Sequence, residues 1–125
     1  MDLVIVMLGT NDLHYTDAAG YREGLSVVAD RILKANTCFP GTSLVFREEP
    51  KLLLISPIEV TPESPFYQES LKFPEMTAQV AQKLGVPWMN AALFAKPSPL
   101  DRCHMEESEH LSLGQAVYEK VKESL

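Results

Sequence analysis

Two sets of polar residues, at opposite ends of the 125-residue chain, have types and spacing that suit chemistry. Near the N-terminus, an apolar run stops at the tetrapeptide Gly9-Thr-Asn-Asp. Near the C-terminus, Asp101 and His104 place a carboxylate and an imidazole three residues apart. Carboxylates and imidazoles are the side chains that most often transfer protons in general acid–base catalysis. The chain therefore offers a candidate proton-transfer pair and, far from it in sequence, a polar loop.

Each set also has an ordinary structural explanation. Glycine, asparagine and aspartate are the usual turn formers, so the tetrapeptide by itself also suits a tight strand-to-loop turn. Asp101 and His104 would equally suit a loop carboxylate and a surface histidine. A chemical role depends on elements that bring the two sets together.

Strands and helices alternate along the chain. Residues 3–8 form a continuous, β-branched-rich apolar run, typical of a strand buried on both faces of a parallel sheet. Asp17 is expected to cap the helix that follows, with an apolar stripe of Tyr21, Leu25, Val28 and Ile32. The predicted strands are residues 3–8, 51–57 and 86–90, and the predicted helices are residues 18–35, 67–84 and 106–124.

The segments between these elements contain the usual breakers. Residues 37–50 are predicted to form a loop, in which residues 43–46 could be extended. Pro74 requires a kink or a late start in the second helix, and Gly85 is expected to end it.

The order β-α-β-α-β-α predicts a single α/β domain, residues 1–125, with a parallel sheet and right-handed crossovers, of the flavodoxin-like three-layer α/β/α sandwich class. Sites in such sheets lie at the carboxyl ends of the strands. The loop at Gly9 leaves the first strand there, and residues 91–104 follow the last strand. Both polar sets are therefore expected at the same edge of the sheet.

Composition narrows the class of partner. A net charge of −6 without a long basic cluster argues against nucleic acid and anionic membrane as partners. The apolar run of residues 3–8 is too short for a membrane-spanning helix or a signal-peptide core. The two cysteines, Cys38 and Cys103, make neither a disulfide framework nor a metal site and are expected to be free thiols. A cytoplasmic protein is the default expectation.

The first polar set lies in a longer stretch, Asp2-Leu-Val-Ile-Val-Met-Leu-Gly-Thr-Asn-Asp-Leu13, that resembles the third sequence block of the SGNH (GDSL-type) serine hydrolases of arylesterase and acyl-esterase type. The resemblance implies that Gly9 lets the backbone turn and that the Asn11 amide points at the developing oxyanion. A neutral donor of fixed direction suits that role. Thr10 would belong to the motif loop, and Asp12 would organise it by accepting backbone hydrogen bonds. The chemistry implied is acyl transfer from a small-molecule ester to serine and then to water, without cofactor or metal.

The second set, within Ser98-Pro-Leu-Asp-Arg-Cys-His-Met105, resembles the Asp-x-x-His block of the same family. The resemblance implies that His104 is the general base and that Asp101 orients its imidazole and stabilises the imidazolium. Arg102 stands where the family usually has a small residue, often glycine. Cys103 is expected to point away from His104 along an extended loop, so a cysteine nucleophile is not expected.

A competing pair, Glu107 and His110, has the same spacing. His110 shares a helical face with Leu113, Val117 and Val121, so a helix-packing role is predicted for it. Glu107 would satisfy the helix dipole in the first turn. Asp101 and His104 are therefore the preferred pair.

The nucleophile block of the family, Gly-Asp-Ser, is absent from the 125 residues. Ser56 is the only serine near a strand's carboxyl end, and it is a weak replacement. The resemblance thus covers the C-terminal two-thirds of a family domain, with the serine expected from outside the chain and little activity expected without it. The first strand would then expose an apolar edge that pairs with another copy or with an upstream fragment. The alternatives are a catalytically inactive α/β module and a flavodoxin-like binding domain.

Overall fold

A parallel sheet of three strands lies at the centre of the computed structural model, which describes residues 3–39 and 50–124. The strands are β1 (Leu3–Met7), β2 (Lys51–Ser56) and β3 (Trp88–Asn90), in the order β1-β2-β3. Val6 pairs with Leu54, and Leu54 pairs with Trp88. The extended piece predicted for residues 43–46, like Asp2 of the first motif, lies outside the described residues.

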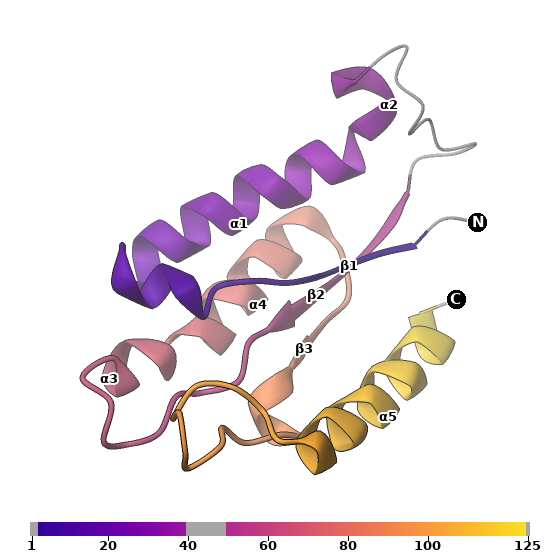
Figure 1. Ribbon diagram of the computed structural model, residues 1–125. Helices are drawn as coiled ribbons and strands as arrows, with labels where there is room; N and C mark the ends of the chain where they lie inside the picture. The colour runs from indigo at the N-terminus through magenta and orange to yellow at the C-terminus, as the bar shows by residue number, and fades with distance from the viewer. Residues whose placement is uncertain (1–2, 40–49, 125) are drawn as a thin grey trace.

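Helices cover both faces of this sheet (Figure 1). Helices α1 (Ala18–Leu33) and α4 (Phe73–Leu84) pack on one face, and α5 (Glu107–Ser124) packs on the other. The predicted three-layer α/β arrangement with a parallel sheet is therefore confirmed.

The pleat of the strands divides the core into two apolar clusters. Val6, Leu52 and Leu54 point toward α1 and α4, whereas Leu53 and Ile55 point toward α5. Because β2 has helices on both sides, residues 52–56 are all buried. On the α5 side of the edge strand β1, Leu3 packs against the α5-side cluster, but Ile5 and Met7 are 43% and 40% exposed.

Helix α1 begins as predicted, because the Asp17 carboxylate accepts a hydrogen bond from the Gly20 amide at 2.9 Å. Tyr21 and Leu25 are buried, but Val28 is exposed and Ala29 takes its place in the core. Val28 instead lines the surface cleft at the carboxyl edge of the sheet. The chain continues in a short helix, α2 (Ala35–Cys38), which overlaps the start of the loop predicted for residues 37–50.

The second predicted helix is divided into α3 (Tyr67–Ser70) and α4. Pro74 lies in the first turn of α4, where its missing N–H has no partner to lose, so the predicted late start is correct. Gly85 ends the helix in the left-handed conformation, at φ 66°. Two short 3₁₀ helices, η1 (Asn11–His14) and η2 (Ala91–Leu93), follow β1 and β3.

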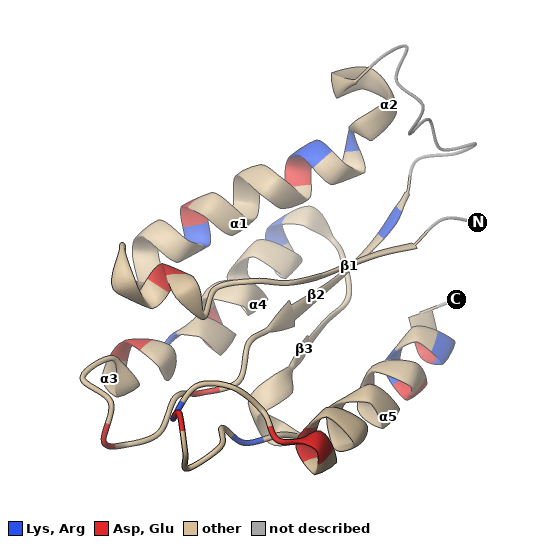
Figure 2. Cartoon of the chain, viewed as in Figure 1, with Lys and Arg blue, Asp and Glu red and all other residues tan. Residues whose placement is uncertain are grey.

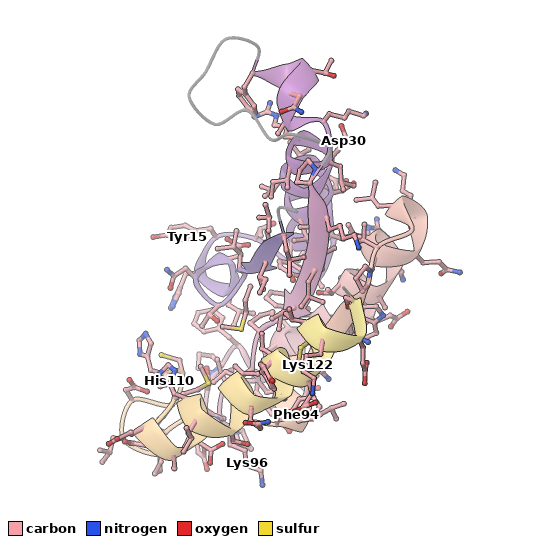
Figure 3. All side chains as sticks on the ribbon, turned by 90° about the vertical axis from the view of Figure 1, so that its right-hand side faces the viewer. Tyr15, Asp30, Phe94, Lys96, His110 and Lys122 are labelled. Atoms are coloured by element: carbon pink, nitrogen blue, oxygen red, sulfur yellow. The ribbon has the colours of Figure 1, made fainter. Side chains whose placement is uncertain are left out.

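Helix α5 starts one residue later than predicted and has an acidic first turn with Glu107 and Glu109 (Figure 2). This arrangement suits the positive end of the helix dipole. Leu113 is buried under the sheet, but His110 is exposed, so its predicted packing role is wrong. The first turns of α5 extend past the sheet edge, and His110 therefore reaches a surface cleft (described below). Figure 3 shows His110 in the first half of α5 and Lys122 near its end. Across residues 3–39 and 50–124, every helix is too short or too polar to cross a bilayer.

Candidate active site

A surface cleft of about 640 Å³ lies at the carboxyl edge of the sheet, and both polar sets contribute to it. The loop at Gly9 lines it together with His104, so the fold brings the two motifs to one place. Met7, Leu8 and Ile58 supply apolar walls. Asp101 stands behind His104, outside the lining. The predicted placement at a common sheet edge is therefore confirmed.

Asp101 and His104 form a hydrogen-bonded pair. His104 Nδ1 lies 2.7 Å from Asp101 Oδ2, so an Nδ1–H donates to the carboxylate and Nε2 is left available. The imidazole side chain is 76% exposed and the carboxylate side chain 48%. This is the relation in which a carboxylate fixes the tautomer and orientation of a histidine base.

The Asp101 carboxylate is also held by the backbone. Its Oδ1 accepts hydrogen bonds from the amides of His104 (2.9 Å) and Cys103 (3.0 Å). These two amides, and then the His104 ring, lower the pKa of Asp101 from 3.8 to about 2. The carboxylate is therefore ionised throughout the neutral range.

Arg102 adopts φ 70°, the left-handed conformation that favours glycine. Its amide donates to the Ser98 carbonyl at 2.9 Å, and its carbonyl accepts from the Thr61 amide at 3.0 Å. Hydrogen bonds on both sides thus impose the conformation that a glycine would adopt more easily. The arginine itself makes the tight turn that aligns the Asp101 carboxylate with the following amides.

Ser98 organises the same loop, a role that sequence reasoning missed. Its amide donates to the His104 carbonyl (2.6 Å), and its Oγ accepts from the Leu100 amide (3.1 Å). The hydroxyl also donates to the Glu106 carboxylate at the start of α5. Ser98 is buried, although the pair that it supports is exposed. The Ser-Pro dipeptide was the available signal, since serine hydroxyls often bond backbone groups two residues on.

The loop is tied to α5 at two further points. The Lys96 amide donates to the Glu109 carboxylate at 2.7 Å. Ser112 Oγ donates to the Phe94 carbonyl at 2.6 Å, and Phe94 lies beside α5 (Figure 3). The part of this segment that precedes the Asp101–His104 pair is therefore fixed to α5, which follows the pair.

Gly9 is required at the other wall of the cleft. It has φ 128°, and a Cβ built there would lie 2.6 Å from Tyr21 Cε2 and 3.3 Å from Phe73 Cε2. The two rings are stacked, with centroids 4.1 Å apart, and Tyr21 Oη is hydrogen-bonded to Thr77 Oγ1 at 2.9 Å. Because this aromatic stack is buried, it cannot move aside for a larger residue.

The residues after Gly9 form a closed turn. The Asp12 amide donates to the Gly9 carbonyl at 2.9 Å, which starts helix η1. The main-chain carbonyl of Asp12 accepts from the amides of Tyr15 and Thr16, each at 2.9 Å. Asp12 thus organises the loop through its backbone carbonyl. Thr10 and the exposed Asn11 line the cleft, as does Asp12.

Cys103 differs from its sequence prediction. Its Sγ lies 3.4 Å from His104 Nδ1, so the thiol does not point away from the histidine. The left-handed turn at Arg102 curls the loop, which brings the two side chains to one side. Burial, and then the Asp101 charge, raise the pKa of this thiol. Cys103 and Cys38 are free thiols, as predicted.

The other histidines and the serine considered from the sequence differ in whether they reach the cleft. His110 lines the cleft, but Glu107 does not, and within the described residues the two share no hydrogen bond or ion pair. His14 stacks edge-on against Phe66, with centroids 4.6 Å apart, and lies outside the cleft lining. Ser56 is fully buried at the end of β2, and its Oγ has no hydrogen-bond partner among residues 3–39 and 50–124. Without access to the cleft, it is no substitute nucleophile.

Comparison with known proteins points to one family of enzymes. No protein-family model matches the chain, and no curated protein matches it. Its structure, however, is similar over the whole chain to the native aryl esterase of M. smegmatis, with 27% identity and a TM-score of 0.84. A putative arylesterase from Agrobacterium tumefaciens str. C58 matches with 26% identity and a TM-score of 0.85.

A carbohydrate acetylesterase from Sinorhizobium meliloti, Est24, shares the fold at 24% identity with a TM-score of 0.85. The chain covers 62% of each of these three solved chains. The motifs of the chain thus resemble those of the SGNH (GDSL-type) esterases, and its fold is that of the solved arylesterases. The chain spans 62% of the length of these solved chains.

Proposed function

We propose that residues 1–125 are one partial domain of an ester hydrolase and supply its general base, orienting acid and an oxyanion donor. The supporting observation is that Asn11 and His104 line one cleft while Asp101 holds the imidazole through Nδ1. The nucleophilic serine comes from outside these residues, since Ser56 is buried away from the cleft. No cofactor is needed for this chemistry.

The reaction follows from the positions of these groups. His104 Nε2 takes the proton of the serine hydroxyl as its oxygen attacks the ester carbonyl. The Asn11 amide donates to the oxyanion that forms, and the ionised Asp101 stabilises the imidazolium. The protonated imidazole then donates to the leaving alcohol, and water hydrolyses the acyl-enzyme by the same route.

The edge of β1 is the expected attachment point for the segment that carries the serine. β1 is an edge strand of the described sheet, and Ile5, Met7 and Leu8 are exposed on or beside it. The relatives are longer than this chain, which covers 62% of the aryl esterase. We therefore propose that a complementing N-terminal segment, or a second copy of the chain, pairs with β1.

The substrate class is a small carboxylic ester. The relatives are described as aryl and carbohydrate acetyl esterases, and the cleft combines apolar walls with polar ends. Acetyl esters of phenols and of sugars are therefore the first substrates to examine.

The test combines the chain with a Gly-Asp-Ser segment, sought in the DNA directly upstream of Met1. We expect the chain alone to be nearly inactive on p-nitrophenyl acetate, because removal of a triad nucleophile leaves only about 10³–10⁴-fold catalysis even with an intact oxyanion hole. Adding the segment should restore hydrolysis, and His104→Ala should abolish it. His14→Ala is the matched control, since His14 lies outside the cleft. Hydrolysis by the chain alone at a rate that His104→Ala leaves unchanged would contradict the assignment.

A further inference from the structure

We propose that Asp101, Cys103 and His104 form a binding site for a soft divalent cation of the Zn²⁺ class. One oxygen, one sulfur and one nitrogen of these side chains lie within 4.8 Å of one another. The sequence alone predicted no metal site, because its two cysteines do not form a metal-ligand pattern. The left-handed turn at Arg102 is what brings the third donor into range.

The distances are close to those of a tetrahedral site. Zn–S and Zn–N bonds of about 2.3 and 2.0–2.1 Å imply a sulfur–nitrogen separation of roughly 3.5 Å. Cys103 Sγ and His104 Nδ1 are already 3.4 Å apart. Asp101 Oδ2, now 2.7 Å from Nδ1, would have to withdraw by roughly 0.7 Å to ligate the same ion.

The loop permits that movement while keeping the donors together. The carboxylate and imidazole are at the surface, so ions reach them without opening the core. Ser98 and Thr61 hold the loop backbone, so little order has to be created on binding. The three donors leave a fourth position for water, as in open zinc sites.

The donor set selects the metal. Thiolate and imidazole favour Zn²⁺ and Cd²⁺, whereas Mg²⁺ and Ca²⁺ require a shell of oxygens. On binding, the Cys103 thiol releases a proton to water, and the single proton of the neutral His104 ring moves from Nδ1 to Nε2. The imidazole thus stays neutral, and the carboxylate and thiolate neutralise the ion's two charges.

A metal ion bound at this site would prevent His104 from acting as a general base. An ion on Nδ1 replaces the hydrogen bond through which Asp101 orients His104, so the filled site has no aligned general base. This consequence rests on the proposed function, whereas the binding itself does not. Zn²⁺ would then act as a reversible inhibitor that chelators remove.

The experiment measures binding without any substrate. The 125-residue chain is titrated with Cd²⁺, following the ultraviolet thiolate-to-metal charge-transfer band, and with Zn²⁺ by calorimetry. Cys103→Ser should lose the Cd²⁺ band and weaken Zn²⁺ binding by about tenfold or more, because a thiolate is replaced by a poor ligand. Cys38→Ser is the matched control and should bind one ion per chain unchanged, since Cys38 lies on α2, outside this cluster. Excess Mg²⁺ should not compete.

Equal binding by Cys103→Ser, or loss of binding in Cys38→Ser, would overturn the site. Circular dichroism checks the fold of each variant, and alkylation of Cys103 in the Cys38→Ser chain gives an independent test if Cys103→Ser does not fold. The two proposals fail separately. A complemented enzyme that is active but binds no Zn²⁺ overturns only the metal site. Zn²⁺ binding through Cys103 in a complemented chain without hydrolysis supports the site and counts against the esterase proposal.

Discussion

At the scale of single residues, two positive-φ positions define the walls of the cleft. Gly9 uses the absence of a side chain, because its backbone is in contact with the buried Tyr21 ring. Arg102 carries a side chain at φ 70°, near the left-handed helical region, at a typical cost of roughly 1–2 kcal/mol. The glycine could be anticipated from its motif, but the conformation of Arg102 depends on hydrogen bonds from distant residues and could not.

The Asp101 carboxylate makes a prediction about acid stability. Its pKa in the folded chain is lowered from 3.8 to about 2, mainly by the two backbone amides. A lowered folded-state pKa means that the group stabilises the fold above about pH 4 and loses this contribution as pH falls through about 2. Asp101→Asn should therefore reduce the free energy of unfolding at pH 6, and the difference from wild type should shrink between pH 4 and 2. Urea denaturation at a series of pH values checks this. A difference that stays constant with pH would contradict the assigned shift.

At the scale of elements, the loop between β3 and α5 carries the exposed side chains of Asp101 and His104, and the buried Ser98 holds this loop in place. Ser98 links three parts of this segment, namely Leu100, the His104 carbonyl and Glu106 in front of α5. These hydrogen bonds from the buried Ser98 explain how a surface loop keeps Asp101 and His104 at hydrogen-bonding distance. Local sequence did not reveal this, because the bonds depend on how the loop returns to α5.

Removal of the Ser98 hydroxyl should therefore destabilise the chain. Ser98→Ala leaves the Leu100 amide and the Glu106 carboxylate without this partner, and a loss of about 1–3 kcal/mol is expected. Thermal unfolding measures the effect. Ser108→Ala is the matched control, since Ser108 is exposed in the first turn of α5 and should change stability by less than about 0.5 kcal/mol. Similar losses in both variants would remove Ser98 from its organising role.

At the scale of the whole molecule, the helical layers cover the sheet unequally. β2 is buried on both faces, but β1 has α1 on one side and solvent over Ile5 and Met7 on the other. Exposed apolar side chains on an unpaired edge strand favour association. One face of β1 therefore packs in the core, and by our proposal the other face, with Ile5 and Met7, forms an interface.

We accordingly expect the chain to elute above its monomer mass in size-exclusion chromatography with light scattering. Ile5→Lys should shift it toward the monomer, because a charge on an edge strand opposes pairing. Leu111→Lys places the same charge at an exposed leucine on α5 and should leave the association unchanged. A stable wild-type monomer at all concentrations would contradict an interface at β1.

The sequence by itself determined the α/β alternation, the family resemblance and the candidate residues Gly9, Asn11, Asp101 and His104. These depend on local signals: an unbroken apolar strand, capping and turn residues, and short motifs at sheet ends. Only the tertiary structure decided that Cys103 faces His104, that His110 lines the cleft and that Ser98 supports the loop. Each of these depends on the path of the backbone between distant segments, because a turn set by long-range hydrogen bonds determines where neighbouring side chains point.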